Sequence, residues 1–141
     1  MKKFIPLLFF LIFPLFAESI GMIKDLYGKV RIKRGDKFIE ASKGLSLKEG
    51  DIIFTDSSSG VGVVFKDGSL LSLDEKSIFK VKSYIFSPEK EKYGIDVKLE
   101  KGKAAFSSGK IGKLAPKSFK FRVPEGVVGI RGTKFLVSVN K

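Results

Sequence analysis

Residues 47–73 read LKEGDIIFTDSSSGVGVVFKDGSLLSL and predict three consecutive β-strands separated by two turns. The first strand, 51–55, is short and rich in β-branched residues, which pack well on a pleated surface. The second strand, 61–65, follows a polar break and places large apolar side chains at alternate positions. The third, 69–73, returns beside it. The segment therefore predicts a β-hairpin preceded by one more strand.

The turn of this hairpin contains Asp67 and Gly68. Asp-Gly in the two-residue position between strands favours a type I′ turn, because glycine tolerates a positive φ without steric cost. We therefore expect a type I′ hairpin here. We also expect Gly68 to hold a positive φ and to be structural.

A second informative segment, residues 119–139, reads FKFRVPEGVVGIRGTKFLVSV and predicts two alternating strands around a Pro-Glu-Gly turn. One face of each strand is apolar: Phe119, Phe121 and Val123 share a face of the first, and Phe135, Val137 and Val139 share a face of the last. From this alternation we expect Phe65, Phe121 and Phe135 to lie in one core.

The remaining chain predicts further short strands joined by polar turns. The expected strands lie at 20–26, 30–33, 37–41, 77–86, 95–99 and 103–107, and a short apolar piece with Leu45 and Leu47 precedes the strand at 51–55. In the strand over 77–86, alternation places Phe79, Val81 and Ile85 on one face. Lys101 and Gly102 are expected to form a tight turn, and the polar segments 87–93 and 108–116 are expected to be loops.

Turn signals recur at short intervals after residue 17, and no apolar period of 3.6 residues persists there for long enough to form a helix of ordinary length. This pattern predicts an all-β fold with a single domain of about 9–12 short strands, arranged as a sandwich, a roll or a short solenoid. The order of the strands does not follow from the pattern.

The first residues have the layout of a secretory signal peptide. A short basic start, 1–3, precedes the uninterrupted apolar segment 4–16, and Ala17 precedes a polar pair. As a helix the apolar segment would span about 20 Å, which is short of a hydrocarbon core of about 30 Å. We expect residues 1–17 to be removed and residues 18–141 to form one exported domain, periplasmic or otherwise extracytoplasmic. A retained membrane anchor is the alternative.

The net charge of the chain is +12, and removing two lysines with the signal peptide leaves 12 − 2 = +10. Such a charge is typical of nucleic-acid-binding proteins. However, export, the scattering of the lysines along the strands and the lack of a recognition helix exclude nucleic acid as the expected partner. The basic residues are interpreted as a solvated surface. The functional alternative is that they attract the protein weakly to an anionic membrane surface or wall polymer.

The composition also limits the chemistry. The chain contains no histidine and no cysteine, which excludes Ser-His and Cys-His nucleophile systems, disulfides and most zinc sites. Three aspartates, Asp51, Asp67 and Asp74, flank turns where such side chains cap backbone N–H groups. We therefore expect no catalytic residue, no metal and no cofactor.

The segments 47–73 and 119–139 resemble the FecR family of extracytoplasmic sensor domains. The resemblance rests on motifs in a fixed order: Gly50-Asp51, Thr55, Ser58, VVF at 63–65, DGS at 67–69, LSL at 71–73, LEKGK at 99–103, Val123-Pro124 and IRGTKFLV at 130–137. The structural residues of the motifs are Gly50, Asp51, Asp67, Gly68, Gly102, Gly132 and Phe135.

The resemblance implies a β domain outside the inner membrane that receives a signal from a protein partner. Family members also carry a cytoplasmic helical part that controls a sigma factor, but only three residues precede the apolar segment here. The expected function is therefore a non-catalytic, exported sensor or interaction module of the cell envelope that takes part in signal transduction. The alternative is a structural module that binds glycan or anionic polymer.

The residues expected to contact a partner lie around the last strand, 133–140: Arg131, Thr133, Lys134, Leu136 and Ser138. Arg131 can bind a carboxylate in a bidentate way or can hold the adjacent turn. If the last strand has an unpaired edge, it can accept a strand from a partner or from a second copy of the chain. Lysines on that strand can instead protect the edge, and the strand can also lie centrally in the sheet.

Overall fold

The computed structural model describes residues 18–128 and 134–140. The expected signal peptide, 1–17, lies outside the described residues. No helix in the described part of the chain is both long enough and apolar enough to cross a membrane.

The described residues form twelve strands in one connected sheet, so the prediction of an all-β fold is confirmed. The strands are β1 Ser19–Tyr27, β2 Val30–Arg34, β3 Lys37–Glu40, β4 Ser46–Lys48, β5 Ile52–Thr55, β6 Gly60–Phe65, β7 Leu70–Leu73, β8 Ile78–Ser87, β9 Lys92–Ser107, β10 Phe119–Val123, β11 Gly126–Val128 and β12 Lys134–Val139. One α-helical turn, α1 Lys110–Leu114, and two 3₁₀ turns, Pro88–Lys90 and Pro116–Ser118, lie between strands.

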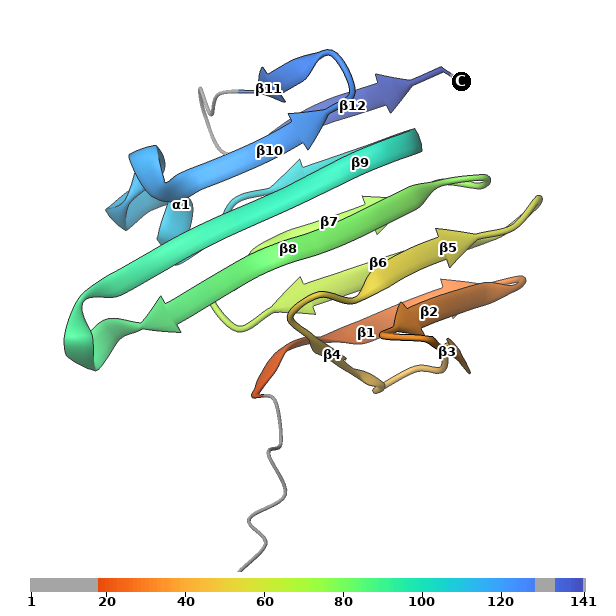
Figure 1. The fold of residues 1–141 in the computed structure, drawn as a ribbon, viewed down its shortest axis with the longest axis horizontal. Helices are drawn as coiled ribbons and strands as arrows, with labels where there is room; N and C mark the ends of the chain where they lie inside the picture. Colours follow the sequence, from red (N-terminus) through yellow and green to blue (C-terminus); the bar gives the residue numbers. More distant parts are fainter. Residues whose placement is uncertain (1–17, 129–133, 141) are drawn as a thin grey trace, which may run out of the picture.

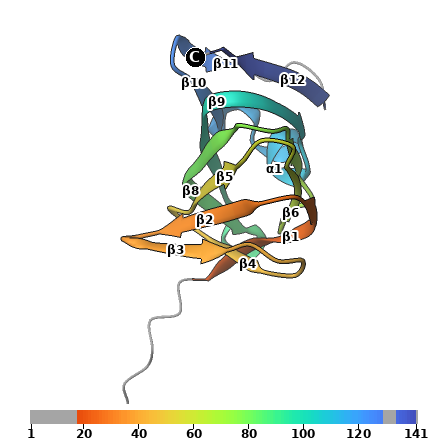
Figure 2. The ribbon, with the colours of Figure 1, turned by 90° about the vertical axis from the view of Figure 1, so that its right-hand side faces the viewer.

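The sheet curls into two layers that share the long strand β9, and Figure 2 shows the layers facing each other. The first layer has the order β4-β1-β6-β7-β9-β12, and the second has the order β3-β2-β5-β8-β9-β10-β11. All pairs are antiparallel except β9 with β10, which is parallel. Of the three expected architectures, a roll describes this arrangement best.

The chain passes from one layer to the other four times at the same end of the roll. These crossings are residues 28–29 between β1 and β2, 56–59 between β5 and β6, 74–77 between β7 and β8, and 101–103 within β9. Figure 1 shows all four on its right-hand side, and we call this side the crossing end. The strands joined by these crossings are neighbours in each layer: β2, β5, β8 and β9 in the second, and β1, β6, β7 and β9 in the first. The four crossings therefore lie next to one another along the crossing end.

The hairpin between β6 and β7 differs from the expected type I′ turn. The Phe65 N–H donates to the Ser69 carbonyl over 2.9 Å, and the Gly68 N–H donates to the Phe65 carbonyl over 3.0 Å. Gly68 has φ +87°, as expected, but Asp67 is not among the residues with positive φ. A type I′ turn needs positive φ at both central residues, so that prediction was wrong. The loop has three residues, and Gly68 takes the left-handed position.

The expected tight turn at Lys101 and Gly102 is also wrong, because β9 continues through both residues. One extra β9 residue is inserted here, since Ile78 pairs with Lys101 whereas Phe79 pairs with Leu99. Gly102 has φ +96°. Such a bulge bends a strand without reversing it, so β9 leaves the second layer and enters the first.

A second bulge in β8 overturns the expected position of Ile85. The pairing with β9 shifts between Val81 and Ser83, and the inward phase moves by one residue. Tyr84 is therefore buried, with 6% of its surface exposed, and Ile85 is 50% exposed. Phe79 and Val81 point inward as expected.

The two expected loops contain more regular structure than the sequence indicated. Within 108–116 the chain forms α1, and Ile111 on this turn is fully buried, so a loop throughout this segment was wrong. Within 87–93 a 3₁₀ turn is followed by the start of β9 at Lys92. The residues of that turn are exposed, as the polar sequence predicted.

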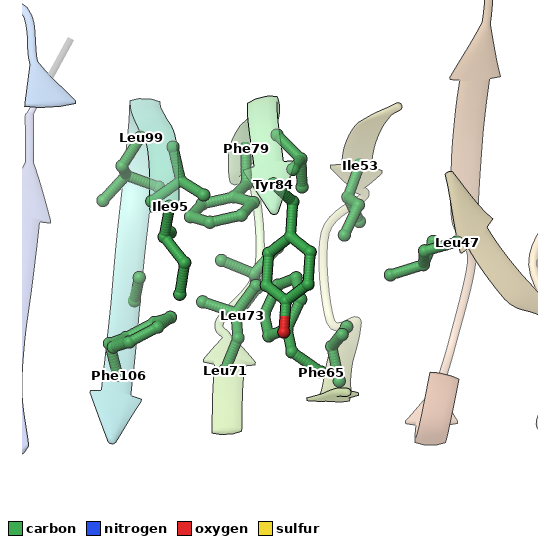
Figure 3. Packing of buried hydrophobic residues seen from close by; sticks show 14 of the residues in the cluster. Leu47, Ile53, Phe65, Leu71, Leu73, Phe79, Tyr84, Ile95, Leu99 and Phe106 are labelled. Carbon is green, nitrogen blue, oxygen red and sulfur yellow. The ribbon is translucent and has the colours of Figure 1, made fainter. Parts of the chain in front are cut away.

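The core lies between the two layers. Figure 3 shows Phe65, Leu71 and Phe106 of the first layer beside Phe79 and Ile95 of the second. The ring of Phe106 lies at the centre of an aromatic cluster, with centroid distances of 6.3 Å to Phe65, 6.0 Å to Phe121, 5.1 Å to Phe119 and 5.6 Å to Phe135. The prediction that Phe65, Phe121 and Phe135 share one core is confirmed.

Candidate interaction surface

The strand β12 lies at an edge of the first layer. Its residues Lys134–Val139 pair antiparallel with Ser107–Gly102 of β9. Within residues 18–128 and 134–140, β12 pairs with no other strand. The side of β12 that faces away from β9 therefore presents backbone N–H and C=O groups to which a further strand can bond.

The side chains of β12 alternate as the sequence predicted. Phe135 and Val137 are partly buried against the core, and Val139 is buried. Lys134, Leu136 and Ser138 point outward. Leu136 is 85% exposed, the largest exposed fraction among the exposed large hydrophobic residues of the described chain. The edge thus combines free backbone groups with one uncovered apolar side chain.

Leu136 ends a row of directly paired residues that crosses the outer face of the first layer. The row consists of Asp25 on β1, Gly62 on β6, Ser72 on β7, Ala105 on β9 and Leu136 on β12. The three central side chains are small, so the sheet surface is hollowed between larger neighbours. Two adjoining hollows of about 720 and 690 Å³ share all five residues. We call this feature the outer groove.

The groove is bounded at its β1 end by side chains that lie over β6. A Cβ atom on Gly62 would collide with the Asp25 carboxylate, and a Cβ on Gly60 would lie 2.5 Å from the Tyr27 ring. Glycine at these two positions therefore allows Asp25 and Tyr27 to lie close against the sheet. The opposite end, at Leu136, opens onto the edge of β12.

Several charged residues surround the groove. The lining residues include Lys24, Lys103 and Lys134 together with Asp25 and Asp74, which gives 3 − 2 = +1. None of these five takes part in an ion pair within the described chain. The surface is therefore apolar along its floor and mildly basic around its rim.

The motif residue Asp51 is structural. It is fully buried, and its carboxylate accepts hydrogen bonds from Arg34 Nε at 3.0 Å and Arg34 Nη2 at 2.8 Å, and from the Lys48 N–H at 2.8 Å. Arg34 Nη2 also donates to the Ser46 carbonyl. The hydrogen bond to Asp51 raises the pKa of Arg34 above its ordinary value. This pair fastens β4 to β2, and its preceding residue Gly50 has φ +90°.

The motif residue Asp67 organises a second buried network. Its Oδ1 accepts from the Tyr84 hydroxyl at 2.8 Å and from the Ser69 N–H at 3.2 Å. Its Oδ2 accepts from the Ser69 hydroxyl at 2.8 Å and from the Ile111 N–H at 3.1 Å. Burial, followed by the hydrogen bond to Asp67, raises the pKa of Tyr84. Asp67 thus joins the β6–β7 turn, β8 and α1.

A third carboxylate fixes the parallel pair of β9 and β10. Asp96 accepts from Arg122 Nε at 2.7 Å and from Arg122 Nη2 at 3.0 Å. The hydrogen bond lowers the pKa of Asp96 below its ordinary value, and the nearby lysines Lys82 and Lys120 contribute in the same direction. This bidentate geometry holds the register of β10.

The structure brings together part of the expected interaction set. Lys134, Leu136 and Ser138 share the outer face of β12. Arg131, Thr133 and the motif glycine Gly132 lie outside the described residues. Of the other motif residues, Gly102 bends β9 and Phe135 packs on Phe106 and Phe121.

Sequence reasoning missed the outer groove and the partners of the two buried aspartates. The Gly-Val-Gly spacing at 60–62 was a visible sign of an unusually small strand face. No local pattern pairs Asp51 with Arg34 or Asp67 with Tyr84, because each pair is joined only by the register of distant strands.

A protein-family model described as FecR protein matches residues 51–141. The chain belongs to the FecR family. Comparisons with curated proteins and with solved structures gave no match. The matched FecR region contains β5 to β12, and so includes Asp67, the bend of β9 and the edge strand. The strands β1 to β4 lie before the matched region; β1 supplies Asp25 and β2 supplies Arg34.

Proposed function

We propose that this FecR-family chain is a non-catalytic, extracytoplasmic sensor module of the cell envelope. It binds a protein partner by accepting a strand of that partner along the edge of β12. The observation that carries the proposal is the one-sided pairing of β12, with Leu136 85% exposed on it. Main-chain hydrogen bonds would give such a complex its affinity, and side-chain contacts would give its specificity.

The outer groove supports this mode of binding. A strand added beside β12 would extend the row that ends at Leu136, so an apolar side chain of the partner would lie against Leu136 and Ala105. The lysines at the rim, Lys103 and Lys134, favour acidic residues at the ends of the partner strand. The proposed partner segment is therefore extended, apolar at its centre and acidic at its ends.

The first experiment places a photo-crosslinking residue at position 136 in the full chain, expressed in cells that export it. A matched control carries the same residue at position 85, because Ile85 is also apolar and 50% exposed but lies on β8 in the other layer. We expect a defined adduct from position 136 and none from position 85. An adduct with the mass of two copies of this chain would contradict a separate partner and would indicate a homodimer.

The second experiment measures amide hydrogen exchange of the full chain with and without the crosslinked partner, purified separately. Strand addition should slow exchange across Lys134–Val139 and leave the amides of β3, at an edge of the second layer, unchanged. Leu136→Lys should weaken the binding because it places a charge on the apolar row. If exchange in β12 is unchanged by saturating partner, strand addition at this edge is wrong.

A further inference from the structure

A separate basic hollow lies at the crossing end of the roll. It has a volume of about 560 Å³ and is lined by residues of all four crossings and of the adjoining ends of β2, β5 and β8. Its charged lining residues are Lys29, Arg31, Lys76, Lys101 and Asp56, which gives 4 − 1 = +3. We call it the basic hollow. It shares no lining residue with the outer groove.

The stacking of the crossings brings these cations together. The Asp56 N–H donates to the Lys29 carbonyl over 3.1 Å, and the Lys76 N–H donates to the Asp56 carbonyl over 3.2 Å. Lys101 lies on β9, the next strand in the second layer, and pairs with Ile78. Neighbouring strands are about 5 Å apart, so Lys76 and Lys101 lie one strand apart, whereas the crossing 56–59, which carries Asp56, separates Lys29 from Lys76. Figure 1 shows the crossings gathered there.

The acids of the protein compensate this charge only in part. Lys29, Lys76 and Lys101 form no ion pair with the described residues. Arg31 forms an ion pair with Asp56 at 3.7 Å, and Asp74 and Glu75 line an adjoining hollow together with Lys76 and Lys101. Like charges held at this spacing repel each other, and a bound anion would relieve the repulsion.

Arg31 lines the basic hollow, and its guanidinium donates no hydrogen bond to an acceptor among residues 18–128 and 134–140. Its guanidinium carbon lies 5.2 Å from the ring centroid of Phe38 and 6.0 Å from that of Phe54, which fixes the side chain against the sheet. Its Nη2 lies 3.7 Å from Asp56 Oδ1, beyond hydrogen-bond distance. Its Nε is buried and has no hydrogen-bond partner among the described residues. Because 40% of the Arg31 side chain is exposed and the residue lines the basic hollow, the exposed part of its guanidinium can donate to an oxyanion bound there.

We propose that the basic hollow binds a phosphate group. Arg31 donates hydrogen bonds to the phosphate oxygens, and Lys29, Lys76 and Lys101 neutralise its charge. The planar guanidinium matches the geometry of phosphate, and several lysines suit an anion that carries more than one negative charge. The site is independent of the β12 edge, and either can exist without the other.

The test titrates the purified, isotope-labelled full chain with inorganic phosphate and follows the backbone amides by NMR. Binding should give saturable chemical-shift changes at the amides of Lys29, Lys76 and residues 56–59. The amides of the 3₁₀ turn between β8 and β9, at the opposite end of the roll, should show none. No saturable shift at the crossing end at millimolar phosphate would overturn the proposal.

Two sets of variants distinguish phosphate binding at these specific residues from attraction by the net charge of the protein. The triple change Lys29→Gln, Lys76→Gln and Lys101→Gln should weaken phosphate binding by at least about tenfold. A control with the same charge change replaces exposed lysines away from the crossing end: Lys90→Gln, Lys92→Gln and Lys110→Gln. It should bind phosphate like the wild type. Equal weakening in the two triple variants would mean that net charge alone attracts the anion, and the site would be rejected.

Arg31→Lys tests the role of the guanidinium, since it keeps the charge and removes the planar donor group. It should weaken binding several-fold while the amide spectrum away from the site stays unchanged. Affinity equal to the wild type would contradict the assigned hydrogen bonds.

Vesicles distinguish the source of the phosphate. Sedimentation with phosphatidylglycerol vesicles, and with phosphatidylcholine vesicles as the neutral comparison, uses the same two triple variants. If the anionic vesicles bind the wild type and the control variant but not the variant with Lys29→Gln, Lys76→Gln and Lys101→Gln, the ligand is a lipid headgroup. Saturable binding of inorganic phosphate without vesicle binding would support a soluble phosphate or phosphate ester at the same site.

Discussion

Removing the carboxylate of Asp67 should strongly destabilise the roll. The side chain is buried, with 2% of the residue exposed, and it accepts four hydrogen bonds from Ser69, Tyr84 and Ile111. In Asp67→Ala the Ser69 N–H and hydroxyl, the Ile111 N–H and the Tyr84 hydroxyl lose this acceptor. A buried donor left unpaired costs about 1–3 kcal/mol, so we expect a loss of about 3–6 kcal/mol.

That loss is a large part of the stability of a domain of this size, which is typically about 5–15 kcal/mol. Urea unfolding of the purified full chain, followed by circular dichroism, measures it directly. Asp36→Ala provides the control, because Asp36 is exposed in the turn between β2 and β3. The control should differ from the wild type by less than about 0.5 kcal/mol.

A double-mutant cycle tests the connection across the core. Tyr84→Phe removes the hydroxyl that donates to Asp67 Oδ1 and accepts from the Asp67 N–H, and it should cost about 1–3 kcal/mol. Because the two changes remove one shared interaction, their costs should not add, and the double variant should be more stable than the sum predicts. Additive costs, or a loss below about 1 kcal/mol for Asp67→Ala alone, would refute the role assigned to this network.

Three other changes test the packing, the bend of β9 and an ion pair. Phe135→Ala should lower the free energy of unfolding by about 2–4 kcal/mol, since its ring packs in the aromatic cluster; a loss below about 1 kcal/mol would contradict this position. Gly102→Ala should lower the melting temperature more than Gly68→Ala does. Both glycines have a positive φ, but only at Gly102 would a Cβ also collide with Ser77; equal melting temperatures of the two variants would contradict this. Asp96→Asn should lower the melting temperature slightly at pH 7, because the depressed folded-state pKa of Asp96 stabilises the protein above the ordinary pKa of about 4. The difference should shrink as the pH falls and the carboxylate is protonated; a difference that does not change with pH would exclude this cause.

Strand positions were predictable from the sequence wherever a strand is regular. The alternation of apolar residues correctly placed β6, β10 and the inward face of β12, because a strand with one buried face has a period of two. The prediction failed at Ile85 and at Gly102 for a common reason. Each lies at or just after a bulge, which shifts the inward phase by one residue, and a bulge depends on the partner strand as much as on the local sequence.

The turn at Asp67 shows a different limit. Asp-Gly is compatible with a two-residue turn and also with a three-residue loop that ends in a left-handed glycine. The choice is made by the buried carboxylate, whose partners on β8 and α1 are distant in sequence. The candidate surface likewise depends on residues that are distant in the sequence. The row from Asp25 to Leu136 exists only because five strands meet in one register, which no single segment specifies.

The bend at Gly102 connects the two proposed binding regions. Lys101 precedes the bend and lines the basic hollow, whereas Lys103 follows it and lines the outer groove. In a regular strand these two residues would point to the same face, because they are two positions apart. The left-handed glycine between them, held close to Ser77, lies where β9 changes layer, so Lys101 reaches the basic hollow and Lys103 the outer groove, while both also line a hollow between these regions. The spacing Lys-Gly-Lys at 101–103 therefore gives both regions a cation from a single short motif, and it makes glycine at position 102 a requirement of the surface as well as of the fold.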